Sequence, residues 1–276
     1  MRKTAIIEKS VAYLVLIVTA LVFLYPVYHV VTTSFKHTVD AFSMPPKWIF
    51  KPTLQYHLHI WTKEPFFRYL VNSLIIAIGT VVVSVPAASL AAYGFVRHRG
   101  SQAVVFLILL LLLATRMFPR MLLVIPYFLI ARTLHLHDTH LILILVMVAF
   151  NQPFSIWLMR GFFINVPREL DEAAVIDGCS PFGALFRVVL PVVTPGIATT
   201  AIFSFLLAYN NYLFPLILTG SKAKTLPVAI AEYGAEKIQY WSISAAGVTG
   251  VIIPIIVIML FLQKYFIRGL ISGAIK

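Results

Sequence analysis

Charged side chains are scarce in this sequence. Of its 276 residues only 12% are Asp, Glu, Lys or Arg, whereas 60% are hydrophobic. A soluble domain has about 25% charged residues and about 45–50% apolar ones. A globule of this size also needs polar side chains to cover its surface. The shortage of charge therefore excludes an ordinary soluble protein, and lipid is the solvent that suits such a composition.

Cysteine is nearly absent too. Because Cys179 is the single cysteine, the chain can form neither an intrachain disulfide nor a metal site with several cysteine ligands. His135, His137, Asp138 and His140 lie close together in the sequence. A metal site needs ligands that converge on one point, and a short outer loop gives no reason to expect that. We therefore predict no metal site.

Two patterns of reactive residues are missing as well. No phosphate-binding loop of the form G-x-x-x-x-G-K-[ST] occurs, so we expect that the chain does not hydrolyse ATP itself. The long apolar runs hold almost no acids or histidines, whereas a membrane-embedded enzyme would need a nucleophile, a metal or an acid–base set there. We predict a protein that is not an enzyme and that binds no cofactor of its own.

Acids are the rarer charge, with 10 Asp and Glu against 22 Lys and Arg, which gives a formal net charge of +12. The basic residues lie mostly in short segments between apolar runs, and no basic stripe with interleaved aromatic residues occurs. We interpret them as interfacial charges that face lipid headgroups, and we predict no nucleic-acid partner.

Long apolar runs are what the sequence has in place of charge. A membrane-spanning helix needs roughly 20 mostly apolar residues, and continuous runs of this length exclude the alternating segments of a barrel. The first run is too long for a signal peptide and lacks an A-x-A-like cleavage site, so we expect it to be retained. The sequence predicts an all-α integral membrane protein with spans at about 11–33, 67–95, 103–130, 140–162, 195–219 and 246–266.

Proline interrupts most of these runs, and a proline inside a helix removes a hydrogen bond and favours a kink. The third run is either one span or a span of about 103–118 followed by a separate helix. Arg116 and Arg120 flank its centre; we interpret them as interfacial side chains that snorkel, with binding of anionic substrate groups as the alternative. Interrupted helices favour a protein that forms a pathway. The kinks are expected at Pro86, Pro153, Pro215 and Pro254.

Neither orientation nor separate domains follow from composition. Lys and Arg divide evenly between the two sides of the membrane, so the positive-inside rule does not decide the topology. The polar stretches are too short for a soluble domain, and no internal repeat is evident. We expect one domain, made of an N-terminal span with the first outer loop (1–66), a transmembrane core (67–266) and a C-terminal tail (267–276).

The segment 163–194 is the least lipid-like internal stretch. Pro167 suits the first turn of a helix, acids follow it, and Gly178 can end that helix. Ser180 and Pro181 are typical of an N-cap and first turn, so two short helices are predicted, the first about ten residues long. On the first helix Leu170, Ala173, Ala174 and Asp177 would share one face. That face either meets a protein partner or lies on the membrane surface.

A longer pattern runs through this segment. Glu172-Ala173-Ala174 is followed by three residues, Gly178, nine residues, and Val188-Val189-Leu190-Pro191. It resembles the EAA motif of binding-protein-dependent ABC importer permeases, which reads EAA, three residues, Gly, nine residues and I-x-L-P. Only Val188 departs from that pattern. Weaker resemblances to the carbohydrate branch, and more narrowly to its maltose-type subunit with six spans, occur at 125–128, 153–158, 209–213, 225–228 and 268–276.

The resemblance implies a function. Such a chain has the type I ABC importer fold, and its EAA loop is a coupling helix that docks on a cytoplasmic ATPase, so that ATP drives alternating access. It implies a second permease subunit, two copies of the ATPase with ATP and Mg²⁺ bound there, an extracytoplasmic solute-binding protein, and a bacterial inner membrane with both termini cytoplasmic. The coupling residues would be Glu169, Glu172, Ala173, Ala174, Asp177, Gly178, Leu190 and Pro191.

Polar residues inside spans are candidates for the substrate path. These are Asn72, Asn151, Asn210 and Asn211, since amides both donate to and accept from hydroxyl-rich ligands. Hydrogen bonding between helices is the alternative for each of them. Asn210 and Asn211 are expected at a kink caused by Pro215, with one lining the path and the other packing, because adjacent residues differ by about 100° around a helix.

One further segment, from about Ser221 to Trp241, is expected to face the solute-binding protein through Tyr233 and Gly234, with a plain connector as the alternative. The solute is a carbohydrate or polyol in the first hypothesis, and a peptide, polyamine or phosphodiester in the second. A secondary carrier is a third hypothesis, but it predicts inverted repeats and intramembrane ionisable groups for ion coupling, and neither is evident.

Overall fold

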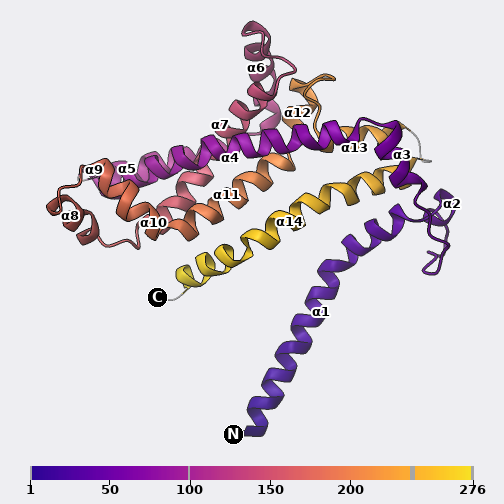
Figure 1. Ribbon diagram of the computed structural model, residues 1–276, viewed down its shortest axis with the longest axis horizontal. Coiled ribbons are helices and arrows are strands. Elements are labelled where there is room, and N and C mark those ends of the chain that lie inside the picture. The colour runs from indigo at the N-terminus through magenta and orange to yellow at the C-terminus, as the bar shows by residue number, and fades with distance from the viewer. Residues whose placement is uncertain (1, 99, 237–239, 275–276) are drawn as a thin grey trace. The chain divides into compact units, whose positions relative to one another are not determined.

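The computed structural model describes residues 2–98, 100–236 and 240–274, and it describes side chains for 9–98, 100–233 and 240–261. All regular structure in this described part is helical (Figure 1). The chain forms two compact units. Unit 1 comprises Met1–Phe67 and Ala229–Pro254, and unit 2 comprises Arg68–Val228 and Ile255–Lys276.

Unit 1 contains α1 (Arg2–Ser34), α2 (Thr38–Ala41), α3 (Gln55–Lys63), most of α13 (Leu226–Glu236) and the first part of α14 (Trp241–Ala274). The side chains of α1 from Val11 to Tyr28 are exposed although nearly all are apolar, which is the surface that lipid or a partner protein must cover. The segment from Ser221 to Trp241, expected to face the solute-binding protein, contains α13, which occupies eleven of its residues.

The long helices of unit 2 pack around a core at one end. They are α4 (Phe66–Arg97), α5 (Gln102–Met117), α7 (His140–Phe163) and α11 (Thr194–Tyr209), and Figure 1 shows α8 and α9 at the same end. Small residues let the helices approach: a side chain at Gly196 would begin 2.4 Å from Phe162 Cγ. The core consists of Ala88, Ala92, Val105, Leu109, Ile156, Met159, Phe163, Val166, Leu185, Val189 and Val193.

The predicted spans occur in the structure either as single long helices or as pairs of helices with a bend between them. Within the described residues, four helices are long and apolar enough to cross a membrane: Lys9–Ser34, Phe66–Arg97, His140–Phe163 and Trp241–Phe261. Two bent pairs, Gln102–Met117 with Arg120–Thr133 and Pro181–Val192 with Thr194–Tyr209, raise the total to six if each pair is one span. The all-α membrane architecture predicted from the apolar runs is confirmed.

The third predicted run does not continue as one helix to residue 130. Helix α5 ends at Met117, and α6 (Arg120–Thr133) leaves it at 90°. Phe118 and Pro119 between them are extended, as expected where the residue before a proline is driven out of the helical region. The alternative with a separate helix is therefore the correct one.

The fifth predicted run is interrupted where the two asparagines lie, but for a different reason. Helix α11 ends at Tyr209 and α12 (Leu213–Leu218) begins three residues after Asn210. Pro215 lies in the first turn of α12, where it breaks no helix. The explanation by a kink at Pro215 is therefore wrong. Asn211 instead caps the new helix, because its Oδ1 accepts the N–H of Phe214 at 3.2 Å.

The segment between α7 and α11 forms the predicted pair of short helices. Helix α8 (Glu169–Ile176) has eight residues and begins two residues after Pro167, which therefore lies outside it. Ser180 caps α9 (Pro181–Ala184) by accepting the N–H of Gly183 at 3.1 Å. The chain then continues as a π-helical turn, η1 (Leu185–Val189), and α10 (Leu190–Val192).

Candidate functional site

Helix α8 is attached to the end of α4 through three side chains, which we call the α4–α8 cluster: Tyr93, Arg97 and Asp171. A terminal nitrogen of Arg97 lies 2.7 Å from Asp171 Oδ2, and the side chains are only 14% and 16% exposed. The Tyr93 hydroxyl donates to Asp171 Oδ1 at 2.6 Å. By its distance, the contact between Arg97 and Asp171 is an ion pair. It is not an aligned hydrogen bond, since Asp171 Oδ2 accepts no hydrogen bond from the described residues.

Backbone groups reinforce this attachment from both sides. Arg97 donates to the carbonyl of Val166 at 3.1 Å, and Arg168 donates to the carbonyl of Val96 at 3.1 Å. The second bond satisfies one of the carbonyls that the end of α4 leaves without a helical partner. Movement of α8 is therefore tied to movement of α4.

The outward face of α8 differs by a rotation from the predicted one. Glu169, Glu172, Ala173 and Ile176 follow the spacing of one helical face and are exposed, Ile176 to 85%. Ala174, which the sequence analysis placed on the same face as Ala173, is buried against its own chain at 5% exposure. The prediction that Leu170, Ala173, Ala174 and Asp177 share one face is therefore wrong for Ala174. A partner would meet two carboxylates, one alanine and one isoleucine.

Gly178 ends α8 in a conformation that requires glycine. Its φ is +88°, and a side chain there would meet nothing within 4 Å, so the constraint is conformational. Beside it, the N–H groups of Gly178 and Cys179 donate to the carbonyls of Val175 and Ala174 at 3.0 and 2.9 Å. These paired bonds close the helix end and fix the turn toward α9.

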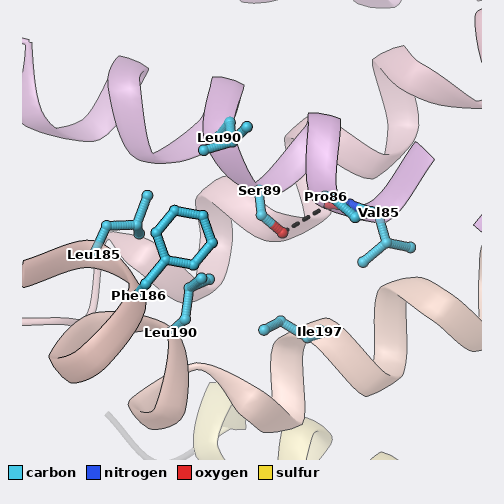
Figure 2. Close-up of a pocket in the computed structure, with 8 residues that line it drawn as sticks. All are labelled: Val85, Pro86, Ser89, Leu90, Leu185, Phe186, Leu190 and Ile197. Atoms are coloured by element: carbon cyan, nitrogen blue, oxygen red, sulfur yellow. Dashed lines mark hydrogen bonds between the residues drawn. The ribbon is translucent and has the colours of Figure 1, made fainter. Parts of the chain in front are cut away.

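The second half of the EAA-like pattern is packed except at its end, where Pro191 is exposed. Val189 is fully buried in the core of unit 2, and Leu190 packs against that core. Leu190 also lines an apolar pocket of about 190 Å³ between α4 and the η1–α11 segment (Figure 2). The one hydroxyl there, of Ser89, donates to the carbonyl of Val85 at 2.8 Å. The pocket therefore offers a hydroxyl-rich solute nothing to bind.

A second candidate site is a cleft of about 480 Å³ where the two interrupted helix pairs of unit 2 meet. Asn210 is exposed there, whereas Asn211 is only 6% exposed. Their exposures thus differ as expected of a lining and a packing residue, while their part in transport stays a prediction. The cleft is lined by Arg120, Phe203, Leu206, Leu207, Asn210, Asn211, Tyr212 and Leu213.

The other two asparagines lie elsewhere. Asn151 is 1% exposed on α7; its Nδ2 donates to the carbonyl of Ser204 at 3.4 Å, and its Oδ1 has no partner in the described part of the chain. Asn72 uses its Nδ2 for the carbonyls of Lys222 and Lys224 at 3.0 and 2.9 Å. These bonds favour the interpretation as interhelical or structural hydrogen bonding for Asn72.

Asn72 belongs to a group that sequence reasoning did not assemble, the loop-anchor cluster of Asn72, Asp138 and His140. His140 Nε2 lies 2.7 Å from Asn72 Oδ1, and Asp138 accepts the N–H groups of Lys222 and Ala223 at 3.1 and 2.9 Å. Burial opposes ionisation of Asp138, but the N–H groups of Ala223, Lys222 and Gly220 outweigh it and hold its pKa below the ordinary value. The cluster fixes the segment that leads into α13.

Tyr233 and Gly234 lie in α13 rather than in an open loop. The Tyr233 hydroxyl donates to Glu64 Oε2 at 3.3 Å within unit 1. Their contact with a binding protein stays a prediction. Among the described residues, no group of three or more His, Cys, Asp and Glu side chains could hold a metal ion.

The α4–α8 cluster is the main feature that sequence reasoning missed. Asp171 was read as one of three acids near a helix N-terminus, and Arg97 as an interfacial charge. Their separation of more than seventy residues leaves no local signal. The only hint is that both lie one turn from a helix end, where a charge can reach a neighbouring backbone.

Comparison with known proteins places this geometry in a family. The model of the family described as "Binding-protein-dependent transport system inner membrane component" matches residues 84–272. A probable ABC transporter permease of Sinorhizobium fredii is 37% identical over 94% of this chain and 92% of its own length. A trehalose/maltose transport system permease of Thermococcus litoralis is 33% identical over 94% of each.

Among solved structures, the fold matches a bacterial ABC transporter involved in the import of the acidic polysaccharide alginate. The TM-score is 0.73, with 23% sequence identity over 94% of this chain and 96% of that one. At that identity the match establishes the fold alone. The family match extends from the middle of α4 into α14 and includes α8 with the whole EAA-like pattern.

Proposed function

The chain belongs to the family of binding-protein-dependent transport system inner membrane components, and on that premise we propose that it is one membrane subunit of an ATP-driven importer for a carbohydrate or polyol. The carbohydrate assignment draws on the relative that carries trehalose and maltose. Its partners are a second permease subunit, two copies of a cytoplasmic ATPase that binds ATP and Mg²⁺, and an extracytoplasmic solute-binding protein. The chain is a multi-pass membrane protein and a transport component, with no hydrolytic step of its own.

The outward face of α8 is the observation that carries this proposal. An eight-residue helix with Glu169, Glu172 and Ala173 exposed, at one end of the long helices, has the shape and charge to dock into a cleft on another protein. The α4–α8 cluster then transmits movement of that partner to a membrane span. A packed core next to α8 favours a rigid-body shift over local bending.

Topology follows from the same assignment. If α8 docks on a cytoplasmic ATPase, the segment 164–193 is cytoplasmic, and six crossings place both termini on that side. The cleft then lies within the membrane, and the loop-anchor cluster lies toward the outer side of the membrane. Reporter fusions after Lys276 and within the 219–225 segment should report opposite sides. Fusions that report the same side would contradict the six-span topology.

The decisive experiment reverses one charge on the outward face. In the complete transporter reconstituted in proteoliposomes, Glu172→Lys should abolish most substrate-stimulated ATPase activity and uptake, while the variant still inserts and the permease pair still forms. Asn165→Lys is the matched control, because it places the same charge in the same exposed segment but off α8. Full uptake by the Glu172 variant would rule out the coupling role.

The solute class needs a separate test. A thermal-shift screen on the cognate binding protein, with mono- and oligosaccharides, polyols, peptides, polyamines and glycerophosphodiesters, should give stabilisation by a carbohydrate or polyol. Stabilisation only by one of the other classes would keep the importer assignment and replace the solute.

A further inference from the structure

Arg116 and Arg120 lie against the middle of α7. The Arg116 guanidinium is 5.1 and 5.3 Å from the ring centres of Phe150 and Phe154, and that of Arg120 is 4.5 Å from Phe150. Both rings belong to the middle of α7, and Phe150 is about 15 Å along the helix from its start at His140. These contacts favour the alternative interpretation, in which the two arginines bind an anionic group, over snorkelling interfacial side chains.

No acid among the described side chains pairs with them there. The ten acidic residues all lie outside 65–133 and 139–168, and neither arginine has an ion-pair partner among the described residues. The phenylalanine faces attract the guanidiniums but cancel no charge. Two like charges without a counter-charge inside the bilayer are strongly unfavourable, and such residues mark functional sites by default.

The arginines border the cleft described above. Arg120 lines it directly, whereas Arg116 lies behind the wall, next to Phe154, whose ring is 5.6 Å from that of the lining residue Phe203. Both helix interruptions adjoin it, since Arg120 begins α6 and Asn210 directly follows the end of α11. Interrupted helices at mid-membrane depth are the usual construction of a solute site in transporters.

The chemistry of the lining selects the ligand. A guanidinium offers a planar fork of donors that matches the oxygens of a carboxylate, sulfate or sulfonate. The exposed amide of Asn210 can donate to and accept from hydroxyl groups. Tyr212 and Phe203 add ring faces for the apolar side of a sugar. A neutral sugar would use the amides and rings but leave both arginine charges uncompensated.

We propose that Arg116 and Arg120 form an anion-recognising site in this cleft and that the transported solute is an acidic saccharide, carrying a carboxylate, sulfate or sulfonate group. The inference rests on the proposed function, since it assigns the solute class within the same pathway. It also identifies this chain as the subunit that recognises the charge of the solute.

The test compares two probes that differ only in charge. A uronic-acid disaccharide and the neutral disaccharide of the same linkage are titrated by calorimetry against the complete transporter in phosphatidylcholine nanodiscs, without binding protein. The wild type should bind the acidic probe at least tenfold more tightly. Arg116→Gln/Arg120→Gln should lose that preference, and Arg120→Lys, which keeps the charge but not the fork, should lose part of it.

Arg132→Gln is the matched control. Arg132 also stacks on a phenylalanine ring, 5.8 Å from that of Phe128, but it is exposed at the far end of α6 and does not line the cleft. Its substitution should leave the preference for the acidic probe intact. A preference that falls equally in this control would show a general charge effect and would overturn the site.

The remaining outcomes separate this inference from the proposed function. Equal binding of both probes by the wild type, or tighter binding of the neutral one, overturns the anion site but leaves the importer assignment standing. Loss of the second permease subunit from the double variant would show that the arginines pair with that subunit's carboxylates, and this too overturns the site. Failure of every saccharide to bind or to be transported would contradict the carbohydrate importer itself.

Discussion

Next to α8, a carboxylate meets a guanidinium and a phenol, whereas at and behind the wall of the cleft two guanidiniums lie against phenylalanine rings. Asp171, Arg97 and Tyr93 compensate each other in charge, and the adjacent core is closely packed. Beside the cleft, Arg116 and Arg120 have no ion-pair partner in the part of the chain that the structure describes. The first region is complete within one chain, and the second is not.

The difference indicates what each region does. A region whose polar groups are satisfied internally can move as a rigid piece and carry a displacement. A region with unsatisfied donors gains free energy only when something else binds, such as a solute or water. The core next to α8 and the region of the cleft are joined by α5, α7 and α11. Under the proposed coupling role, a shift that begins at α8 would reach the cleft through helices rather than loops.

The largest effect is expected from breaking the α4–α8 cluster. Asp171→Asn should destabilise the protein by about 3 kcal/mol, the low end for a buried pair because both side chains keep some exposure. The variant leaves Arg97 buried without its counter-charge. Thermal unfolding of the purified complex measures the loss, and substrate-stimulated ATPase activity should fall while basal hydrolysis continues.

A double-mutant cycle sharpens this prediction. Arg97→Gln with Asp171→Asn removes both charges and should recover part of the stability, because no buried charge remains. Coupling should stay impaired in the double variant if the ion pair transmits movement, and return if it only stabilises. Additive losses of stability would mean that the two side chains do not interact.

The next effect is at the end of α8. Gly178→Ala should cost about 1–2 kcal/mol, since an L-residue is strained at a φ of +88° even with open space around it. Gly178→Asn should lose less, because asparagine tolerates the left-handed region. Circular dichroism melts of both variants test the order. Equal losses would show that α8 ends in another way in the assembled transporter.

Much of the fold could be predicted because a membrane-spanning helix is determined by its own local sequence. Runs of apolar residues gave the positions of α1, α4, α7 and α14, since each span must satisfy its backbone within itself. The break at Phe118-Pro119 also has a local cause. The interruption after Tyr209 does not: Pro215 suggested a kink, and the capping role of Asn211 became visible only with the helix start beside it.

Part of the candidate site could likewise be predicted from the sequence, and part could not. Spacing predicted α8, its glycine end and the pattern that Leu190 and Pro191 complete. It could not predict that Ala174 turns inward, because that depends on how α8 packs against α9 and η1. Nor could it place Arg116 beside the middle of α7, since that contact depends on how α5 packs against α7.

A smaller effect separates the two asparagines of the cleft. Asn211→Ala should lower the free energy of unfolding by about 1 kcal/mol through loss of the cap on Phe214. Asn210→Ala should change it by less than about 0.5 kcal/mol, because the side chain is exposed. Uptake should respond in the opposite order. If Asn210→Ala were the more destabilising change, the assignment of lining and packing roles would have to be reversed.

The smallest effect concerns the loop-anchor cluster, whose satisfied polar groups resemble the α8 region rather than the cleft. The pKa of Asp138 is lowered in the folded protein, so its contribution to stability is present above its ordinary value of 3.8 and is lost as the pH falls through the folded value. Asp138→Asn should therefore lower the melting temperature of the complex slightly at pH 6, and the difference from wild type should shrink below pH 3.8. The matched control is Asp40→Asn, which removes a carboxylate from the pair with Lys47 in unit 1. This variant should leave the 219–225 segment as resistant to proteolysis as it is in the wild type. A difference between wild type and Asp138→Asn that stays constant from pH 6 to pH 3 would mean that the carboxylate charge does not hold this segment.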